Sequence, residues 1–309
     1  MKIVFFGNAD FGIPSLEKLA SRHQIATVVT NPDKPQGRGK KPAATPIKQK
    51  AVSLNIPLIE AENLQGDDLY SRLKSLQAES FLVIAYRILP ERIFTLPPKG
   101  TVNLHASLLP RYRGAAPIRW ALINGEQKTG VTTFFIEKMV DTGKMILQKE
   151  TQIGDEEPYG ELYQRLSHLG AEAVLETVEM IEKGGVELRP QDPAQASPAP
   201  KITKELCRID WNQDVNRICN LVRALSPKPG AFTSYQGKTL KILQARALGS
   251  DLTAVQPGTV TSAEEKEGLK VSSVEGEVQI LALQLEGKSA MSAEEFLRGS
   301  RIKAGERLG

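Results

Sequence analysis

The sequence contains little cysteine and no long apolar run. Only two of its 309 residues are cysteines, Cys207 and Cys219, so neither a disulfide framework nor a cysteine-rich metal site is predicted. No stretch approaches the roughly 20 apolar residues that a membrane helix needs. The first residues enter a strand-like pattern without the layout of a signal peptide. These absences predict a cytoplasmic protein without a metal or a membrane partner.

Several familiar catalytic motifs are also missing. Residues 7–12 follow a predicted strand and open a predicted helix, but they lack the G-x-G-x-x-G spacing of a dinucleotide site. No Gly-Lys-Ser/Thr follows them, as a phosphate-binding Walker motif would require. The sequence also lacks a G-x-S-x-G nucleophile elbow. A nicotinamide-dependent dehydrogenase is therefore excluded, and residues 7–12 are interpreted as a tight strand-to-helix turn.

Strand and helix patterns alternate in the first half of the chain. Apolar runs of strand length cover residues 2–6, 26–30, 81–86, 102–105 and 131–136, and an apolar stripe predicts one long helix over 158–183. Such alternation is typical of an α/β fold with a doubly wound, mostly parallel sheet.

The composition changes after this α/β part. Four prolines lie within residues 189–201, which is typical of an extended linker. A helix is predicted over 209–225, and short strands separated by glycines then predict a small OB-like β-barrel. The predicted divisions are a catalytic domain over 1–188, a linker over 189–206 and a second domain over 207–309.

Residues 101–117 hold the most informative pattern. Asn103 and His105 alternate with apolar residues, so they share one face near the end of a predicted strand. An amide donor beside an imidazole, with a carboxylate nearby, is what acyl transfer needs. Asp141 is the candidate carboxylate. It lies 36 residues after His105, so its proximity must come from the fold, and the loop after residues 131–136 would end at the same sheet edge if that run forms the neighbouring strand. A structural role for His105 and a turn role for Asp141 remain the alternatives.

These residues also carry a family resemblance. The motifs Asn103-Leu-His105, Ser107-Leu-Leu-Pro110 and Asp141-Thr-Gly143, together with residues 112–117, resemble the 10-formyltetrahydrofolate-dependent formyltransferases. The likeness covers nearly the whole chain. It is greatest to the members that act on methionyl-tRNA, since Ile209-Asp-Trp211 and residues 223–230 match beyond the linker. Glycinamide ribonucleotide formyltransferases share the Asn-x-His part but end near the linker.

The resemblance implies a reaction and a set of site residues. A monomer would transfer a formyl group from 10-formyltetrahydrofolate to the α-amine of initiator methionyl-tRNA, giving formylmethionyl-tRNA for translation initiation. Asn103 would donate to the developing oxyanion, His105 would shuttle the proton, and Asp141 would stabilise the imidazolium. The folate cleft would be lined by Ser107, Leu108, Leu109, Pro110, Ile88 and Leu89. One departure is Arg87, which stands where relatives often have glycine, in a loop that borders the folate pocket.

Two stretches are rich in basic residues. Residues 31–50 hold six basic side chains against the single acid Asp33, and residues 216–249 hold six with no acid. A charge run is usually only a solvated face. The resemblance instead implies that the first stretch is a loop that enters the acceptor-stem region of tRNA, through Arg38, Lys40 and Lys41. An OB-type barrel often binds nucleic acid, so the second stretch is a further candidate.

Other functions stay open on the sequence alone. One is formyl transfer to an amino-sugar nucleotide, and another is hydrolysis of the folate donor with release of formate. A third, from a different class, is a non-catalytic nucleic-acid-binding protein with an OB domain. The intact set of Asn103, His105 and Asp141 favours an enzyme.

Overall fold

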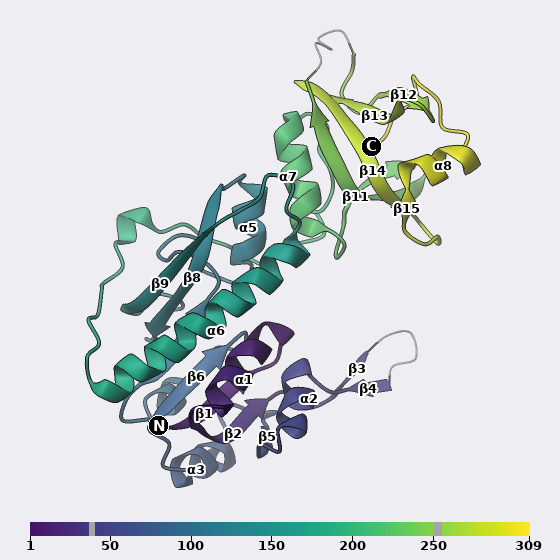
Figure 1. Ribbon diagram of the computed structural model, residues 1–309. Helices are drawn as coiled ribbons and strands as arrows, with labels where there is room; N and C mark the ends of the chain where they lie inside the picture. Colours follow the sequence, from purple (N-terminus) through teal and green to yellow (C-terminus); the bar gives the residue numbers. More distant parts are fainter. Residues whose placement is uncertain (37–40, 250–254) are drawn as a thin grey trace. The chain divides into compact units, whose positions relative to one another are not determined.

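The computed structural model describes residues 1–36, 41–249 and 255–309, which form two compact units (Figure 1). Unit 1 comprises Met1–Pro117, Lys128–Thr151 and Tyr163–Ala199. Unit 2 comprises Ile118–Gln127, Gln152–Leu162 and Pro200–Gly309. Each unit therefore gathers stretches that are separated in the sequence.

A seven-stranded sheet forms the centre of unit 1. Its strand order is β5 (Leu58–Glu60), β2 (Gln24–Thr30), β1 (Lys2–Gly7), β6 (Ser80–Ile84), β7 (Thr101–His105), β8 (Lys128–Phe135) and β9 (Met145–Gln152). The pairings from β5 through β7 are all parallel. The predicted mostly parallel sheet is confirmed for these five strands. However, β8 is antiparallel to β7, so the assumption that its following loop ends beside His105 is wrong.

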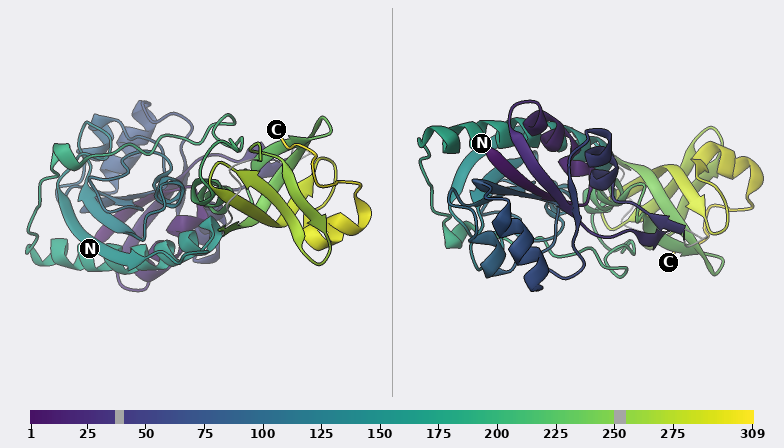
Figure 2. Two further views of the ribbon diagram at one scale, coloured as in Figure 1. Left: turned by 90° about the horizontal axis from the view of Figure 1, so that it is seen from above. Right: turned by 90° about the horizontal axis from the view of Figure 1, so that it is seen from below.

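Helices cover both faces of this sheet, as the doubly wound prediction requires. The helices of unit 1 are α1 (Ile13–Ala20), α2 (Pro46–Ser53), α3 (Asp67–Ser75), α4 (Glu91–Phe94) and most of α6 (Tyr159–Lys183), with short 3-10 turns η1 (Asp10–Gly12) and η2 (Pro193–Gln195). Helix α5 (Pro117–Ile123) belongs, apart from Pro117, to unit 2. In both views of Figure 2, α3 lies on the opposite side of the strands from α6. The long helix predicted over 158–183 is confirmed as α6.

Successive side chains of the buried strand β1 point to opposite faces of the sheet, so both faces of the sheet can pack against helices. Val4 and Phe6 belong to the apolar cluster that includes α3 and α4, whereas Phe5 points to the other face. Gly7 ends the strand where a Cβ atom would lie 2.9 Å from the Phe5 ring and 3.2 Å from Ile47. Residues 7–12 thus form the tight strand-to-helix turn that their spacing predicted.

The antiparallel sheet of unit 2 has the order β10 (Ala231–Tyr235), β11 (Lys238–Leu248), β14 (Gly276–Leu285), β13 (Gly268–Ser273) and β12 (Val260–Glu264), with β15 (Met291–Ser292) beside β14. It confirms the predicted β domain as an antiparallel sheet. The strand path ends at β10 and β12, and residues 305–309 bridge these two edges, because Gly305 donates to Val260 of β12 and Gly309 donates to Ser234 of β10. A capping box formed by Ser292 and Glu295 begins helix α8 (Ala293–Gly299).

Helix α7 (Val215–Leu225) is shorter than predicted. It starts at Val215, and the Asp214 side chain accepts from the Arg217 amide at its N-terminus. Ile209 and Trp211 are buried in the core of unit 2, but the Ile209 amide donates to the carbonyl of Phe232 in β10. Their apolar spacing therefore reflects packing beside a strand and not a helical turn.

Part of unit 2 comes from the middle of the chain. The Arg119 guanidinium on α5 donates to the carbonyls of Ala224 and Lys228, at 2.6 and 2.9 Å, near the end of α7. The same group lies 3.7 Å from the centroid of the Tyr159 ring. Arg223 of α7 donates to the Gly154 carbonyl at 2.9 Å. Residues 118–127 and 152–162 are thereby attached to α7 by hydrogen bonds and ring stacking.

Candidate active site

Strand β7 brings Asn103 and His105 to one face. Leu104 lies between them and points to the other face, where its side chain approaches Gly170 of α6. The backbone of β7 is paired on both sides, because Asn103 lies opposite Val83 of β6 and His105 lies opposite Thr132 of β8. The two polar side chains therefore project from a strand whose position is fixed by its neighbours.

His105 is buried, and its two ring nitrogens face different groups. Nε2 lies 2.8 Å from the carbonyl oxygen of Tyr112, and Nδ1 lies 3.7 Å from Oδ2 of Asp141. A carbonyl oxygen can only accept, so Nε2 carries the proton and donates it. In the neutral ring, Nδ1 then holds the lone pair and is free to accept a proton beside a carboxylate.

Asn103 offers an unused amide. Its side chain is half-buried, and within the described part of the chain it has no hydrogen-bond partner. Both of its N–H groups are therefore available to a bound molecule.

Asp141 reaches His105 by a route that the sequence did not indicate. The last residue of β8, Phe135, lies opposite Val102 at the start of β7, away from His105. Residues 136–144 then fold back, with Gly143 so close to the Phe135 carbonyl that a Cβ atom would lie 1.7 Å from it. Asp141 adopts a left-handed φ of 54°, and its Oδ2 accepts from the Gly114 amide at 2.9 Å. The predicted proximity of Asp141 to His105 is present, but a folded loop produces it.

The loop after β7 is held by residues that no sequence pattern singled out. The Thr132 hydroxyl donates to the Ser107 carbonyl at 2.7 Å and accepts from the Leu109 amide at 3.1 Å. The Ser197 hydroxyl accepts from the Tyr112 amide at 2.9 Å. Gln191 contacts both this loop and the Asp141 loop. Ser197 and Gln191 belong to the proline-rich stretch whose composition is that of a linker, so no local signal distinguished them.

The residues predicted to line a folate cleft fall into two groups. Ile88 and Leu89 follow β6, and Ser107, Leu108, Leu109 and Pro110 follow β7, so the two groups come after neighbouring parallel strands. Ile88 is 76% exposed, whereas the other five are buried or half-buried. Leu108 lies against Gly130 of β8, and the Ser107 hydroxyl donates to the Arg111 carbonyl. Ile88 is therefore the member of the set with a free apolar surface.

Arg87 ties two loops of unit 1 together. Its guanidinium donates to the carbonyls of Ala61 and Glu62, after β5, and to the hydroxyl of Tyr86. It also stacks over the Tyr86 ring at 5.3 Å from the centroid. Arg87 thus braces the loop after β6, which leads to Ile88.

The predicted tRNA-binding residues lie largely beyond what can be described. Arg38 and Lys40 fall outside the described residues. Lys41 begins strand β4 (Lys41–Ala43), which pairs with β3 (Lys34–Gln36) as a hairpin. At the base of the hairpin, Lys48 contacts Asp33 and Glu60 at 2.7 and 2.8 Å. Of the aromatic residues in the second basic stretch, Tyr235 is buried in the core of unit 2.

No other candidate site in the described part of the chain holds comparable chemistry. Burial raises the pKa of Cys219 to about 11 and also raises that of Cys207, so neither thiol is available as a thiolate near neutral pH. The described residues hold no cluster suited to a metal ion, and none of their helices could span a membrane.

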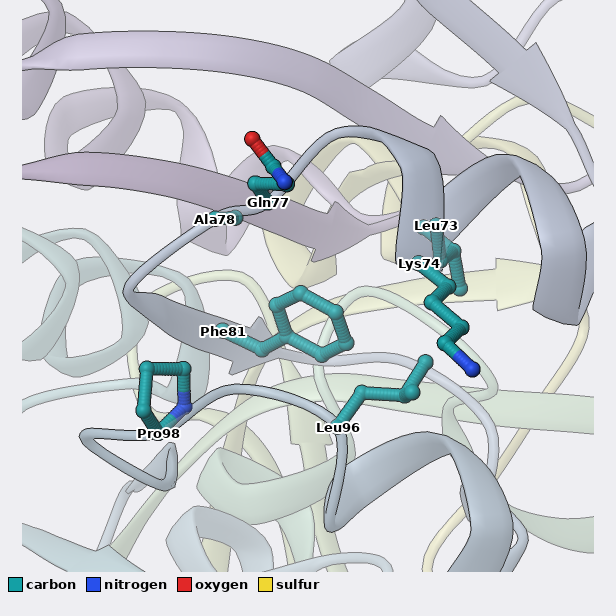
Figure 3. A pocket seen from close by; sticks show the side chains of 7 residues that line it. All are labelled: Leu73, Lys74, Gln77, Ala78, Phe81, Leu96 and Pro98. Carbon is teal, nitrogen blue, oxygen red and sulfur yellow. The ribbon is translucent and has the colours of Figure 1, made fainter.

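A pocket of about 200 Å³, lined by both polar and apolar side chains, lies elsewhere in unit 1 (Figure 3). Its walls include Leu73 of α3, Phe81 of β6 and Leu96. Phe81 is paired with Thr101 at the start of β7, so this pocket lies at the strand ends opposite to His105. It is therefore separate from the candidate active site.

An amide donor, an imidazole and a carboxylate at one sheet edge, without a usable thiol, are the parts of an acyl-transfer enzyme that needs no nucleophile of its own. Residues 1–178 match the family model described as formyl transferase, and residues 201–301 match its C-terminal domain model. The chain belongs to the formyl transferase family.

A named relative and two solved structures are similar to this chain. The methionyl-tRNA formyltransferase of Alkaliphilus oremlandii is 42% identical over 100% of both chains. The fold resembles an N-formyltransferase from Helicobacter canadensis in complex with folinic acid and dTDP-3-aminofucose, with a TM-score of 0.68, 20% identity, and coverage of 91% of this chain and 98% of that one. It also resembles HypX of Aquifex aeolicus in complex with tetrahydrofolic acid, with a TM-score of 0.64, 19% identity and coverage of 96% of this chain. The chain spans about half of HypX, or 47% of its length.

Proposed function

We propose that the chain transfers the formyl group of 10-formyltetrahydrofolate to the α-amine of initiator methionyl-tRNA. The observation that carries the chemistry is the Asn103 amide, which has no partner among the described residues and lies on the same strand face as a buried His105 whose Nδ1 faces Asp141. The choice of acceptor is supported by the full-length relative named methionyl-tRNA formyltransferase.

Each of the three residues has a distinct task in this proposal. The Asn103 amide donates to the formyl oxygen as negative charge develops there, and the acceptor amine forms its bond to the formyl carbon. His105 Nδ1 takes the proton that the amine loses, and the carbonyl of Tyr112 holds the ring by its Nε2 proton. The Asp141 carboxylate, 3.7 Å away, stabilises the resulting imidazolium. The proton then passes to the folate nitrogen as its bond to the formyl carbon breaks.

The acceptor needs little activation. An α-amine has an ordinary pKa of about 7.7–8.0, and an adjacent ester lowers it. Much of the amine is therefore already neutral at physiological pH. This property fits a site in which His105 has only to receive a proton during the reaction.

The residues present also suit the folate donor. Asn103 supplies a free amide, and Ile88 supplies an exposed apolar surface after the neighbouring strand. In this proposal residues 1–188 carry out formyl transfer and residues 207–309 bind tRNA. Residues 189–206 connect them, and Gln191 and Ser197 of this connecting stretch also hold the site loops. Arg38, Lys40 and Lys41 contact the acceptor stem.

The test is a single-turnover assay with 10-formyltetrahydrofolate and two alternative acceptors. We expect formylmethionyl-tRNA from the methionyl-tRNA reaction and no formylated sugar from an amino-sugar nucleotide. The second acceptor is included because a solved relative with this fold was crystallised with an amino-sugar nucleotide. Formylation of the sugar alone would reject the tRNA assignment, and release of formate without either product would indicate a hydrolase.

Replacing Arg38 with alanine is expected to weaken tRNA use while leaving the donor unaffected. Loss of one phosphate contact removes an electrostatic contribution that falls with salt, with a log–log slope near −0.9 per contact on duplex. We expect KM for methionyl-tRNA to rise several-fold and its salt dependence to become shallower. Arg72→Ala is the control, since Arg72 lies on α3 with a side chain that is 51% exposed. Equal losses of tRNA and folate binding would contradict the assignment of this loop.

A further inference from the structure

The side-chain amide of Gln191 is fully used in hydrogen bonds. Its Nε2 donates to the carbonyls of Asp141 and Gly143, both at 2.9 Å. Its Oε1 accepts from Nε and Nη2 of Arg113, at 3.0 and 2.7 Å. An amide has two N–H donors and an oxygen with two lone pairs, so all four positions are occupied.

These four bonds join the loop that contains Arg113 to the loop that contains Asp141 and Gly143. The first loop contacts His105, and the second carries the carboxylate that faces it. Arg113 lies between Tyr112, whose carbonyl accepts from His105 Nε2, and Gly114, whose amide donates to Asp141 Oδ2. On the other side, Gln191 fixes the backbone of Asp141 itself. Gln191 is thus connected to both loops although it is 50 residues beyond Asp141.

The Asp141 backbone needs such support. Its φ of 54° lies in the left-handed region, which is sparsely populated for residues other than glycine and persists where surrounding contacts enforce it. The Nε2 bonds to Asp141 and Gly143 provide two of those contacts on either side of Thr142. Without them, the loop could relax and move the carboxylate away from His105.

We propose that Gln191 is a positioning residue that holds the Asp141 carboxylate against His105 Nδ1. This inference rests on the proposed function, because it assigns Asp141 a role in the reaction. Gln191 touches no reacting atom and acts through the two loops. Only a neutral amide offers two donors for the carbonyls together with an acceptor for Arg113.

The experiment compares Gln191→Met with Gln195→Met in single-turnover formyl transfer. Gln195 lies in the same segment, is exposed, and donates to Asp192. A misplacement of about 1 Å can cost roughly 100-fold in rate, so we expect kcat of Gln191→Met to fall about 10- to 100-fold. KM for both substrates should change by no more than about twofold, as should every parameter of Gln195→Met. An unchanged kcat in Gln191→Met would overturn the proposal.

Two further variants separate positioning from general support of the fold. Gln191→Glu keeps an acceptor for Arg113 but loses the donors, so its kcat should fall as far as that of Gln191→Met. Full activity of Gln191→Glu would show that only the Arg113 contact matters. In an Asp141→Asn background, Gln191→Met should cost no more than about twofold, because residues that act as a unit are not additive. Additive losses would reject the route through Asp141.

Hydrogen exchange tests the same inference without any substrate. The Gly114 amide is protected by Asp141 Oδ2, so it should exchange faster in Gln191→Met and at the wild-type rate in Gln195→Met. Equal protection of Gly114 in both variants would reject the positioning role. An inactive wild type with the expected exchange difference would instead reject the proposed acceptor and leave the loop linkage standing.

Discussion

Replacing His105 with alanine is expected to lower the single-turnover rate of formyl transfer by at least about 100-fold, because a positioned acid or base contributes roughly 10²–10⁴. In the proposed mechanism His105 Nδ1, which lies 3.7 Å from Asp141 Oδ2, accepts the amine proton, and alanine leaves the amine without an acceptor. The measurement is the rate of formylmethionyl-tRNA formation with both substrates saturating. KM for each substrate should change much less than kcat, since the lost interaction develops in the transition state.

Because His105 is buried, the control must separate a loss of catalysis in His105→Ala from a loss of folding. His105 is 6% exposed and its ring donates to the Tyr112 carbonyl, so thermal unfolding of His105→Ala should be recorded beside the rate. His168→Ala is the matched substitution, because His168 is an exposed residue of α6. A folded His105→Ala enzyme with nearly the wild-type rate would overturn the catalytic role of His105 while leaving the proposed reaction intact.

Asn103→Ala is expected to lower kcat by roughly 10²–10³, the usual cost of losing one oxyanion donor. Because Asn103 has no partner within the described part of the chain, its loss should leave the melting temperature nearly unchanged. This combination distinguishes Asn103 from His105, whose removal breaks an internal hydrogen bond. The measurements are the single-turnover rate constant of formyl transfer and the midpoint of thermal unfolding.

Asn103→Asp is a second variant that tests whether the Asn103 amide is the hydrogen-bond donor. Aspartate has nearly the shape of asparagine, but its ionised form cannot donate and its charge repels a developing oxyanion. We therefore expect Asn103→Asp to be at least as slow as Asn103→Ala. An Asn103→Asp enzyme with wild-type activity would show that the amide is not the donor to the formyl oxygen.

Sequence reasoning succeeded where side-chain periodicity carries the information. The alternation around Asn103 and His105 predicted a shared strand face, and both residues do lie on strand β7, two positions apart. The direction of β8, in contrast, could not be predicted from its residues. Its central residues are buried in succession, a pattern typical of a strand inside a parallel sheet, and the pattern does not encode direction. The position of Asp141 therefore depended on a folded loop that the sequence did not reveal.

The contacts around Asp141 were beyond prediction for a related reason. Gln191 lies among prolines without periodic spacing, and its partners are distant in the sequence. The predicted start of α7 was wrong for the opposite reason. Ile209 and Trp211 have apolar spacing typical of a helix, but the Ile209 amide and the Trp211 indole both donate to residues of β10. Periodicity reports burial, whereas hydrogen bonds between distant segments depend on the completed fold.

The attachment of α5 to α7 bears on how this chain could be divided or recombined. The family models end and begin at residues 178 and 201, yet Arg119 and Tyr159, both before that border, complete the surroundings of α7. A gene fragment cut between the models would leave the Arg119 guanidinium without its two carbonyl acceptors, and the Ala224 and Lys228 carbonyls without a donor. A C-terminal segment taken from a relative would therefore have to present acceptors for the Arg119 guanidinium, which lies in the N-terminal part of this chain.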